Sequence, residues 1–280
     1  MDRMRIVILT LLAMVAFASN SLLCRLALRE TAIDAASFTF IRLLSGAITL
    51  CLIVITRKTA RITAGSWISA LALFAYAAAF SFAYISLSAG TGALLLFGAV
   101  QATMIFWGFR TTERLTGRQW FGLAIALGGL VALVFPGLSA PPIGGALLMT
   151  SAGIAWGIYS LRGKGAGDPI SVTAGNFWRS VVLAAVLSVA LLRWAVLDPI
   201  GIRYAVVSGA LASGVGYVIW YSALRGLKAT TAATVQLSVP VLAAVGGILF
   251  LSESITWRLV LASVFILGGI GQVIMERTSG

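Results

Sequence analysis

Aromatic side chains recur at helical spacing in three apolar stretches of the sequence. Tyr76, Phe80 and Tyr84 follow one another every four residues and therefore fall on one face of a helix. The other two stretches contain Trp156 with Tyr159, and Tyr217 with Trp220. Such rings can line a cavity, stack on the apolar part of a solute and attract an ammonium group by about 1 kcal/mol or more. Packing between helices or an interfacial belt is the alternative for each ring taken singly, although Trp156 and Tyr217 lie too deep for a belt.

Two glutamines stand alone inside otherwise apolar stretches, at positions 101 and 236. An unsatisfied amide is costly in such surroundings, so each must face another helix, water or a solute. Contact with a substrate and a hydrogen bond between helices explain them equally well. Together with the aromatic residues they form the predicted substrate-binding set: Tyr76, Phe80, Tyr84, Gln101, Trp156, Tyr159, Tyr217, Trp220 and Gln236.

Three further residues are candidates for gating. Arg42 and Arg179 each lie about eight residues into an apolar stretch, at matching places in the two halves of the chain. They could extend toward lipid head groups, or they could be elements of two gates or attract a substrate carboxylate. Pro240 removes a backbone hydrogen bond and can kink its helix, which makes it a candidate hinge. Proline is also tolerated in membrane helices without such a role.

Several kinds of chemistry are missing from the sequence. There is no histidine, and the eight acidic residues all fall at a terminus, in a loop or at the edge of an apolar stretch. We therefore expect no metal site, no cofactor and no enzymatic activity, and a proton relay through a central carboxylate is disfavoured. No phosphate-binding loop is present, which excludes ATP hydrolysis. Glu113 and Glu253 are predicted to cap or pair locally with Arg118 and Arg258.

The composition is that of an integral membrane protein. Of the 280 residues, 60% are hydrophobic and only 10% are charged, whereas soluble domains carry about 25% charged residues. The net charge of +12 is typical of basic cytoplasmic loops, so we expect no nucleic-acid partner. Because a membrane helix needs roughly 20 apolar residues, the chain accommodates ten. They are expected at 6–24, 34–56, 67–87, 90–109, 117–135, 143–161, 171–192, 202–224, 229–251 and 257–275.

The distribution of basic residues predicts the orientation of these helices. With the N-terminus inside, thirteen of the twenty Lys and Arg residues fall in cytoplasmic segments and five in external ones. The positive-inside rule therefore places both termini in the cytoplasm. Since no sizeable extramembrane domain fits in the remaining residues, the lipid bilayer is the main environment of the chain.

The two halves of the sequence repeat each other. Arg25 precedes Arg42 by 17 residues, just as Arg162 precedes Arg179, and further matches follow along the chain. We therefore divide the chain into repeats at 1–137 and 138–280. Five spans per repeat is an odd number, so the repeats must cross the membrane in opposite directions, as in many secondary transporters. The stretches contain no ring of charges or carbonyl-rich filter sequence, which favours a transporter over a channel.

Three segments carry a resemblance to a known family. The segments Glu113-Arg-Leu-Thr and Glu253-Ser-Ile-Thr precede the fifth and tenth spans, and Ser238-Val239-Pro240 lies in the ninth. With the tandem five-span repeat, these features resemble the EamA-type drug/metabolite transporter superfamily over essentially the whole chain. The first half departs from the pattern, with Ala99-Val100-Gln101 and no proline. Length and aromatic content look like the YddG-type amino acid exporters, which implies a ten-helix exporter of small metabolites in a bacterial inner membrane.

The sequence thus predicts an all-α membrane protein that exports small amino-acid-like metabolites. Alternating access would expose a central aromatic cavity to each side in turn, and the absence of a central carboxylate favours facilitated movement of a zwitterionic or neutral solute. Transport of other metabolites or drugs on the same fold is the main alternative. An intramembrane enzyme and a purely structural protein are the others. Because both repeats lie in one chain, we expect a monomer to suffice.

Overall fold

The computed structural model describes residues 3–57, 64–111, 116–135, 140–163, 167–227 and 229–276, except for the side chains of 109–111, 229, 230 and 276. All regular elements in these ranges are helical. Ten helical spans are long and apolar enough to cross a membrane, and they coincide with the ten predicted stretches. The first half comprises α1 (Arg3–Glu30), α2 (Ala35–Thr56), α3 (Trp67–Tyr84), α4 (Ala89–Thr111) and α5 (Gly117–Val134).

The second half contains more elements because two of its spans are interrupted. It begins with α6 (Ile143–Gly163), α7 (Pro169–Ala190) and the short η1 (Leu192–Trp194). The eighth span consists of α8 (Pro199–Val207), the π-helix η2 (Ser208–Val215) and α9 (Gly216–Leu224). The ninth consists of α10 (Ala229–Gln236) and α11 (Ser238–Leu251), and α12 (Trp257–Glu276) is the tenth.

Polar caps explain where several helices begin. Asp34 accepts hydrogen bonds from the backbone N–H groups of Ala36 and Ser37 at the start of α2. Asp168 accepts one from Ser171 N at the start of α7, where Pro169 occupies the first turn. These side chains satisfy backbone donors that have no partner within the helix. The span boundaries follow from such local signals, which is why the sequence predicts them well.

The break in the ninth span has a local cause. Proline has no N–H group, so Pro240 cannot bond to the carbonyl of Gln236, and its ring crowds that carbonyl. The helix α10 ends at Gln236, four residues before the proline. The N–H of Leu237 instead bonds to Thr234 O in a tighter turn, at 3.1 Å. The predicted kink at Pro240 is thus present as a complete interruption between α10 and α11.

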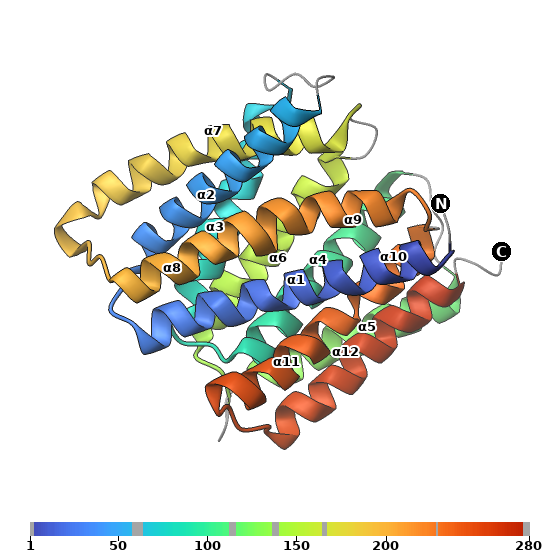
Figure 1. The fold of residues 1–280 in the computed structure, drawn as a ribbon. Helices are drawn as coiled ribbons and strands as arrows, with labels where there is room; N and C mark the ends of the chain where they lie inside the picture. The colour runs from blue at the N-terminus through green and yellow to red at the C-terminus, as the bar shows by residue number, and fades with distance from the viewer. Residues whose placement is uncertain are drawn as a thin grey trace.

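Helices from the two inverted repeats pack mainly on each other. In Figure 1, α2 lies beside α7, and α12 lies along α5, so that the repeats interlock instead of forming separate bundles. The other main partners are α3 with α6, α4 with α11, and α1 with α8 and α9. Each of these contacts joins one half of the chain to the other. Both ends of the described chain lie at the same end of the bundle, where α1 begins and α12 ends (Figure 1).

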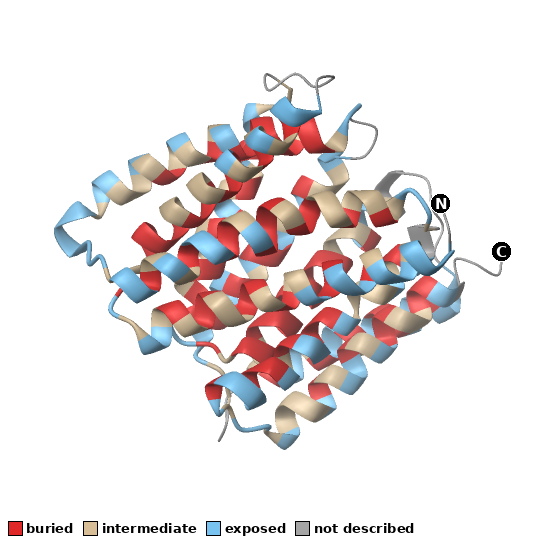
Figure 2. Ribbon diagram, in the orientation of Figure 1, coloured by how far each residue is buried: buried red, intermediate tan, exposed pale blue. Residues whose placement is uncertain are grey.

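The outer surface of the bundle is apolar along its length. Figure 2 shows exposed residues on the outward faces of the helices and buried residues where helices face each other. Large apolar side chains such as Leu11, Val186 and Phe250 are more than half exposed. Such a belt suits contact with lipid tails, because only groups without hydrogen-bonding needs are stable there.

Glycine allows close approach between the repeats. A Cβ atom on Gly209 of η2 would lie 2.0 Å from the backbone oxygen of Arg42 in α2. On the α2 side, a Cβ on Gly46 would lie 2.7 Å from the ring of Phe177 in α7. Small residues at such positions let backbones approach and gain van der Waals contact, which drives association of helices in lipid.

Candidate functional site

A cavity of about 510 Å³ lies between the two repeats. Volumes of this size are typical of sites for small molecules. Residues of α1, α3, α4, α6, α7, η2, α9 and α10 contribute to its wall. Eight of the nine predicted substrate-binding residues line it: Tyr76, Phe80, Gln101, Trp156, Tyr159, Tyr217, Trp220 and Gln236.

The cavity opens toward the end of the bundle that holds the chain ends, here called the terminal side. At that end it is lined by three exposed arginines, Arg57, Arg162 and Arg225. Arg57 and Arg225 directly follow α2 and α9, and Arg162 lies in the last turn of α6. At its other end the wall is made of buried residues such as Asn20, Phe80 and Ser213. The cavity is therefore open on the terminal side and closed toward the opposite end, here called the far side.

Aromatic rings from both repeats meet inside the cavity. Trp156 of α6 stacks on Tyr217 of α9, with ring centroids 5.5 Å apart and an angle of 18° between the planes. It also contacts Tyr76 of α3 at 4.8 Å. Phe17 of α1 contacts the ring of Tyr217 at 5.9 Å and that of Trp220 at the same distance. These rings form a continuous apolar wall with several faces available for stacking on a solute.

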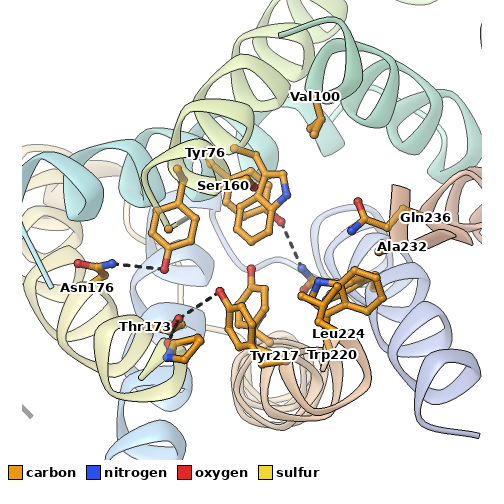
Figure 3. Close-up of a pocket in the computed structure, with 18 of the residues that line it drawn as sticks. Tyr76, Val100, Ser160, Thr173, Asn176, Tyr217, Trp220, Leu224, Ala232 and Gln236 are labelled. Atoms are coloured by element: carbon orange, nitrogen blue, oxygen red, sulfur yellow. Dashed lines mark hydrogen bonds between the residues drawn. The ribbon is translucent and has the colours of Figure 1, made fainter. Parts of the chain in front are cut away.

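Polar side chains are distributed around this wall. In Figure 3, Asn176 and Gln236 lie on opposite sides of the aromatic residues, and Thr173 lies near the same ring cluster. Asn176 donates from Nδ2 to Tyr159 Oη at 3.5 Å. Cavities that bind small molecules commonly combine an apolar wall with a few placed polar groups, which fix the orientation of the ligand.

All the charged residues among the described lining residues are arginines. The three at the mouth are Arg57, Arg162 and Arg225, and Arg162 donates from Nε to Ser69 Oγ at 3.1 Å. Acidic side chains of the described part of the chain lie at helix ends, outside the cavity wall. The cavity therefore has a positive electrostatic character, which disfavours purely cationic solutes.

Arg42 does not extend toward lipid head groups. Its side chain is buried in the interior, with only 2% of the residue exposed. The guanidinium lies over the ring of Phe80 at 4.7 Å and over that of Tyr76 at 5.4 Å, and Nη2 donates to Tyr76 Oη at 3.1 Å. The snorkelling alternative is therefore wrong for Arg42, because these contacts turn the side chain inward, behind the cavity wall.

Arg179 occupies a different environment from its counterpart in the first repeat. It donates from Nη1 to Ala64 O and to Gly175 O, each at 2.9 Å, and lies 6.0 Å from the centre of the Trp67 ring. These contacts tie α7 to the segment before α3 on the terminal side. Arg179 does not line the cavity. The matched sequence positions thus have unequal surroundings in this conformation.

An ion-pair network lies on the far side of the cavity. Arg25 lies within α1 and pairs with Glu253, with Nε 3.3 Å from Oε1 and both side chains about 90% buried. Arg25 Nη1 also donates to Tyr84 O at 2.8 Å and to Ile85 O at 3.0 Å. The other carboxylate oxygen of Glu253 accepts from Ala89 N at 2.8 Å. We call Arg25, Glu253 and these backbone groups the far-side latch.

The latch corrects the local pairing predicted for Glu253. Arg258 instead donates from Nη1 to Phe135 O, while Glu253 reaches across to Arg25 and, at 4.0 Å, to Arg29. Ser252, which directly precedes Glu253, has a left-handed conformation and ends α11 at this point. Glu113, the counterpart of Glu253, lies outside the described residues.

Tyr84 is the one predicted binding residue that does not line the cavity. Its hydroxyl donates to Ala89 O at 3.2 Å, and its ring packs where Gly92 leaves space, because a Cβ there would lie 2.4 Å from the ring. The residue belongs to the packing beneath the latch. Tyr84 follows Phe80 by four residues, but four residues exceed one helical turn slightly, so this face of α3 has rotated away from the cavity by the end of the helix.

Other residues that line the cavity gave only weak signals in the sequence. Phe17 and Phe97 line the cavity but look like ordinary members of apolar stretches. Ser213 faces the cavity from the π-helix η2, a feature with no sequence signature. Asn20 and Asn176 are isolated amides like the two glutamines, so the same reasoning finds them.

Comparison with known proteins identifies the fold and the class. The sequence pattern of the EamA-like transporter family matches residues 4–135 and again 143–275. The chain belongs to this family. The double match coincides with the two five-helix repeats, and membership makes the chain a multi-pass membrane transporter of the drug/metabolite superfamily.

Two relatives and one solved structure are similar to this EamA-like transporter. It is 56% identical to the Pseudomonas aeruginosa protein PA1977, over 98% of this chain and 96% of that one. It is 35% identical to the threonine/homoserine exporter RhtA of Salmonella typhimurium, over 42% of this chain and 41% of the exporter. A crystal structure with 15% sequence identity superposes with a TM-score of 0.69 and covers 98% of this chain and 99% of its own, which shows a shared fold.

Proposed function

We propose that this transporter exports small amino-acid-like metabolites by alternating access through the aromatic cavity. The observation that carries the proposal is the cavity itself, which lies between two inverted repeats, opens on one side only and is lined by stacked rings from both repeats. Similarity to an exporter of threonine and homoserine over part of the chain supports this class of cargo. Other metabolites or drugs are the second candidate, since the fold carries many cargoes.

The orientation follows from charge. The terminal side holds Arg57, Arg162 and Arg225 around the cavity mouth, and basic residues concentrate on the cytoplasmic side of a membrane protein. We therefore place the terminal side in the cytoplasm of a bacterial cell, with the protein in the inner membrane. In this orientation the structure is open to the cytoplasm, ready to load a solute for export.

The gates lie at the two ends of the cavity. The far-side latch closes the external end, and its opening must accompany closure of the cytoplasmic end around the arginine-lined mouth. Arg179 is a candidate element of the cytoplasmic gate because it links α7 to Ala64 beside that mouth. The break before Pro240 lets α10, which carries Gln236, tilt separately from α11. Arg42 acts at the closed end of the cavity.

We propose that the repeats divide near residue 137, and the ends of the two family matches, at residues 135 and 143, support this boundary. All the principal helix contacts run between the repeats, so one chain supplies both halves of the moving interface. A monomer is therefore sufficient for transport. Movement is facilitative in this proposal, because no carboxylate of the described residues lies in the cavity wall to bind and release a proton.

Flux into proteoliposomes tests the proposal. Purified protein is reconstituted and challenged with a panel of labelled amino acids, with and without an imposed pH gradient, alongside the Trp156→Ala variant and a Trp120→Ala control that removes an exposed tryptophan of α5. We expect saturable flux that ignores the pH gradient, falls in Trp156→Ala and persists in Trp120→Ala. Well-folded protein that transports no amino acid would overturn the cargo assignment and favour the second candidate.

A further inference from the structure

The guanidinium of Arg42 is a buried charge with no counter-charge beside it among the described residues. Arginine stays protonated in proteins, so the 2%-exposed side chain carries a full positive charge in the interior. The titratable groups that interact with it are Tyr76, Cys24 and Tyr217, and none of them is a carboxyl group. Within the described ranges no carboxylate lies within 4 Å of Arg42, and its Nη1 has no hydrogen-bond partner. A buried charge is costly unless it is paired.

The hydroxyl of Tyr76 connects this charge to the cavity. Its oxygen accepts from Arg42 Nη2 at 3.1 Å and from Asn20 Nδ2 at 3.5 Å, which uses both of its lone pairs. The hydroxyl hydrogen has no acceptor in the described part of the chain. Because Tyr76 lines the cavity, this hydrogen is available to a solute. A phenol polarised by an adjacent guanidinium is a strong donor and prefers an anionic acceptor.

Ser213 adds a second unused donor in the same region. Its hydroxyl oxygen is buried and has no hydrogen-bond partner within the described ranges, and the residue lines the cavity. It lies on the π-helix η2, which contacts the Arg42 backbone through Gly209, one turn earlier. Arg42 Nη1 and Ser213 Oγ are the two unpartnered buried side-chain polar atoms in the described residues, and both belong to the α2–η2 contact. Helices with π geometry occur frequently at functional sites.

From these groups we infer that the closed end of the cavity binds the carboxylate of the substrate, through the hydroxyls of Tyr76 and Ser213 with the Arg42 charge behind them. This inference deepens the proposed function, on which it rests, by assigning the substrate class: solutes that carry a carboxylate. The ammonium group of an amino acid then lies toward the Trp156–Tyr217 stack, where ring faces attract cations. Arg42 is a positioning residue in this account, because Tyr76 and Phe80 separate it from the cavity.

A purely structural use of Arg42 predicts a different specificity. An arginine that only joined α2 to α3 through Tyr76 would affect folding and all solutes equally. A charge that selects carboxylates affects the ratio between a solute with a carboxylate and the same solute without one. The ratio of two fluxes through one variant also cancels differences in the amount of active protein, so it separates the two roles.

The experiment compares uptake of L-threonine and L-threoninamide in proteoliposomes, since the two differ only in replacement of the carboxylate by an amide. The variants are Arg42→Lys, Arg42→Met and Tyr76→Phe, with Arg203→Gln as a control that removes an exposed arginine of α8. We expect wild type and Arg203→Gln to prefer threonine by at least about tenfold, the scale of one charged hydrogen bond. Arg42→Met and Tyr76→Phe should lose most of that preference, and Arg42→Lys should retain part of it.

Each result has a distinct meaning. If wild type transports both solutes equally, or if Arg42→Met and Tyr76→Phe keep the wild-type ratio, the carboxylate site is wrong while the exporter survives. If wild type transports neither solute nor any other amino acid, the proposed function itself fails. Should Arg42→Met not fold, Tyr76→Phe alone decides, because it removes only the hydroxyl.

Discussion

Neutralising Glu253 should open the far side of the transporter. Glu253→Gln preserves the side-chain shape and the oxygen that accepts from Ala89 N, but it removes the charge that faces Arg25 at 3.3 Å. Removing one partner of a buried ion pair costs about 3–5 kcal/mol. Arg25 keeps its hydrogen bonds to Tyr84 O and Ile85 O, so we take about 2 kcal/mol as the net loss. The far-side-open population should then rise about 30-fold.

A native cysteine reports this opening. Cys24 is 0% exposed in this conformation and precedes Arg25 in α1, directly beneath the latch. In a Cys51→Ser background, a membrane-impermeant maleimide added from the far side reacts with Cys24 only when the latch opens. The labelling rate should therefore follow the open population and rise by roughly the same factor in Glu253→Gln.

The control removes a similar charge at the surface. Glu30 pairs with Arg29 at 3.2 Å, but both side chains are about half exposed, so the pair is worth about 0–1 kcal/mol. Glu30→Gln should leave the labelling of Cys24 nearly unchanged. Arg25→Gln breaks the latch from its other partner and should accelerate labelling as well. If folded Glu253→Gln and Arg25→Gln both label at the wild-type rate, the latch does not hold the far side closed.

Three further predictions concern other parts of the fold. Pro240→Ala restores the N–H group that can bond to Gln236 O, so transport in proteoliposomes should slow while the protein remains folded; unchanged flux would argue against a hinge there. Gly209→Ala should lower the melting temperature in detergent, because the added Cβ would meet Arg42 O. Gly268→Ala is the control and should not lower it, because no atom lies within 4 Å of the added Cβ. Equal melting temperatures for the two variants would contradict the packing account. Burial opposes ionisation of Asp34, but hydrogen bonds from Ser37, Val196 and Ala36 outweigh it and hold the pKa of this loop carboxyl below its ordinary value. Asp34→Asn should therefore destabilise the protein at pH 7. The melting-temperature difference from wild type should vanish as the pH falls through and below about 4. A difference that does not shrink as the pH falls below about 4 would show that ionisation of Asp34 is not its cause.

Local and periodic features of this protein could be predicted from its sequence. The ten spans follow from long apolar runs, and the interruption of the ninth span follows from the missing N–H of Pro240. Tyr76 and Trp156, which the aromatic spacing marked as candidates, line the cavity, because one face of a helix keeps its direction over one or two turns. The inverted arrangement followed from the odd number of spans per repeat.

Features that depend on distant contacts could not be predicted. Glu253 pairs with Arg25 across 228 positions of sequence, and no local pattern distinguishes that partner from Arg258. The π-helix around Ser213 has no sequence signature. Its glycine Gly209 can be explained only from the structure, because the backbone of α2 lies where a Cβ would be. Whether Arg42 turns toward lipid head groups or inward depends on Tyr76 and Phe80 in another helix. The charge of Arg42 is compatible with both directions, so the sequence could not distinguish them.

The most direct test of alternating access is to measure both ends of the cavity in one protein. Spin labels at Gly163→Cys and Arg225→Cys span the mouth on the terminal side, and labels at Glu30→Cys and Ile255→Cys span the latch region, each pair on a background without native cysteines. Pulsed electron resonance gives both distances in lipid, with and without a transported amino acid. The account predicts that the solute shortens the terminal-side distance in part of the population and lengthens the far-side distance in the same proportion. Distances that stay fixed at both ends during active flux, or that lengthen together, would contradict it.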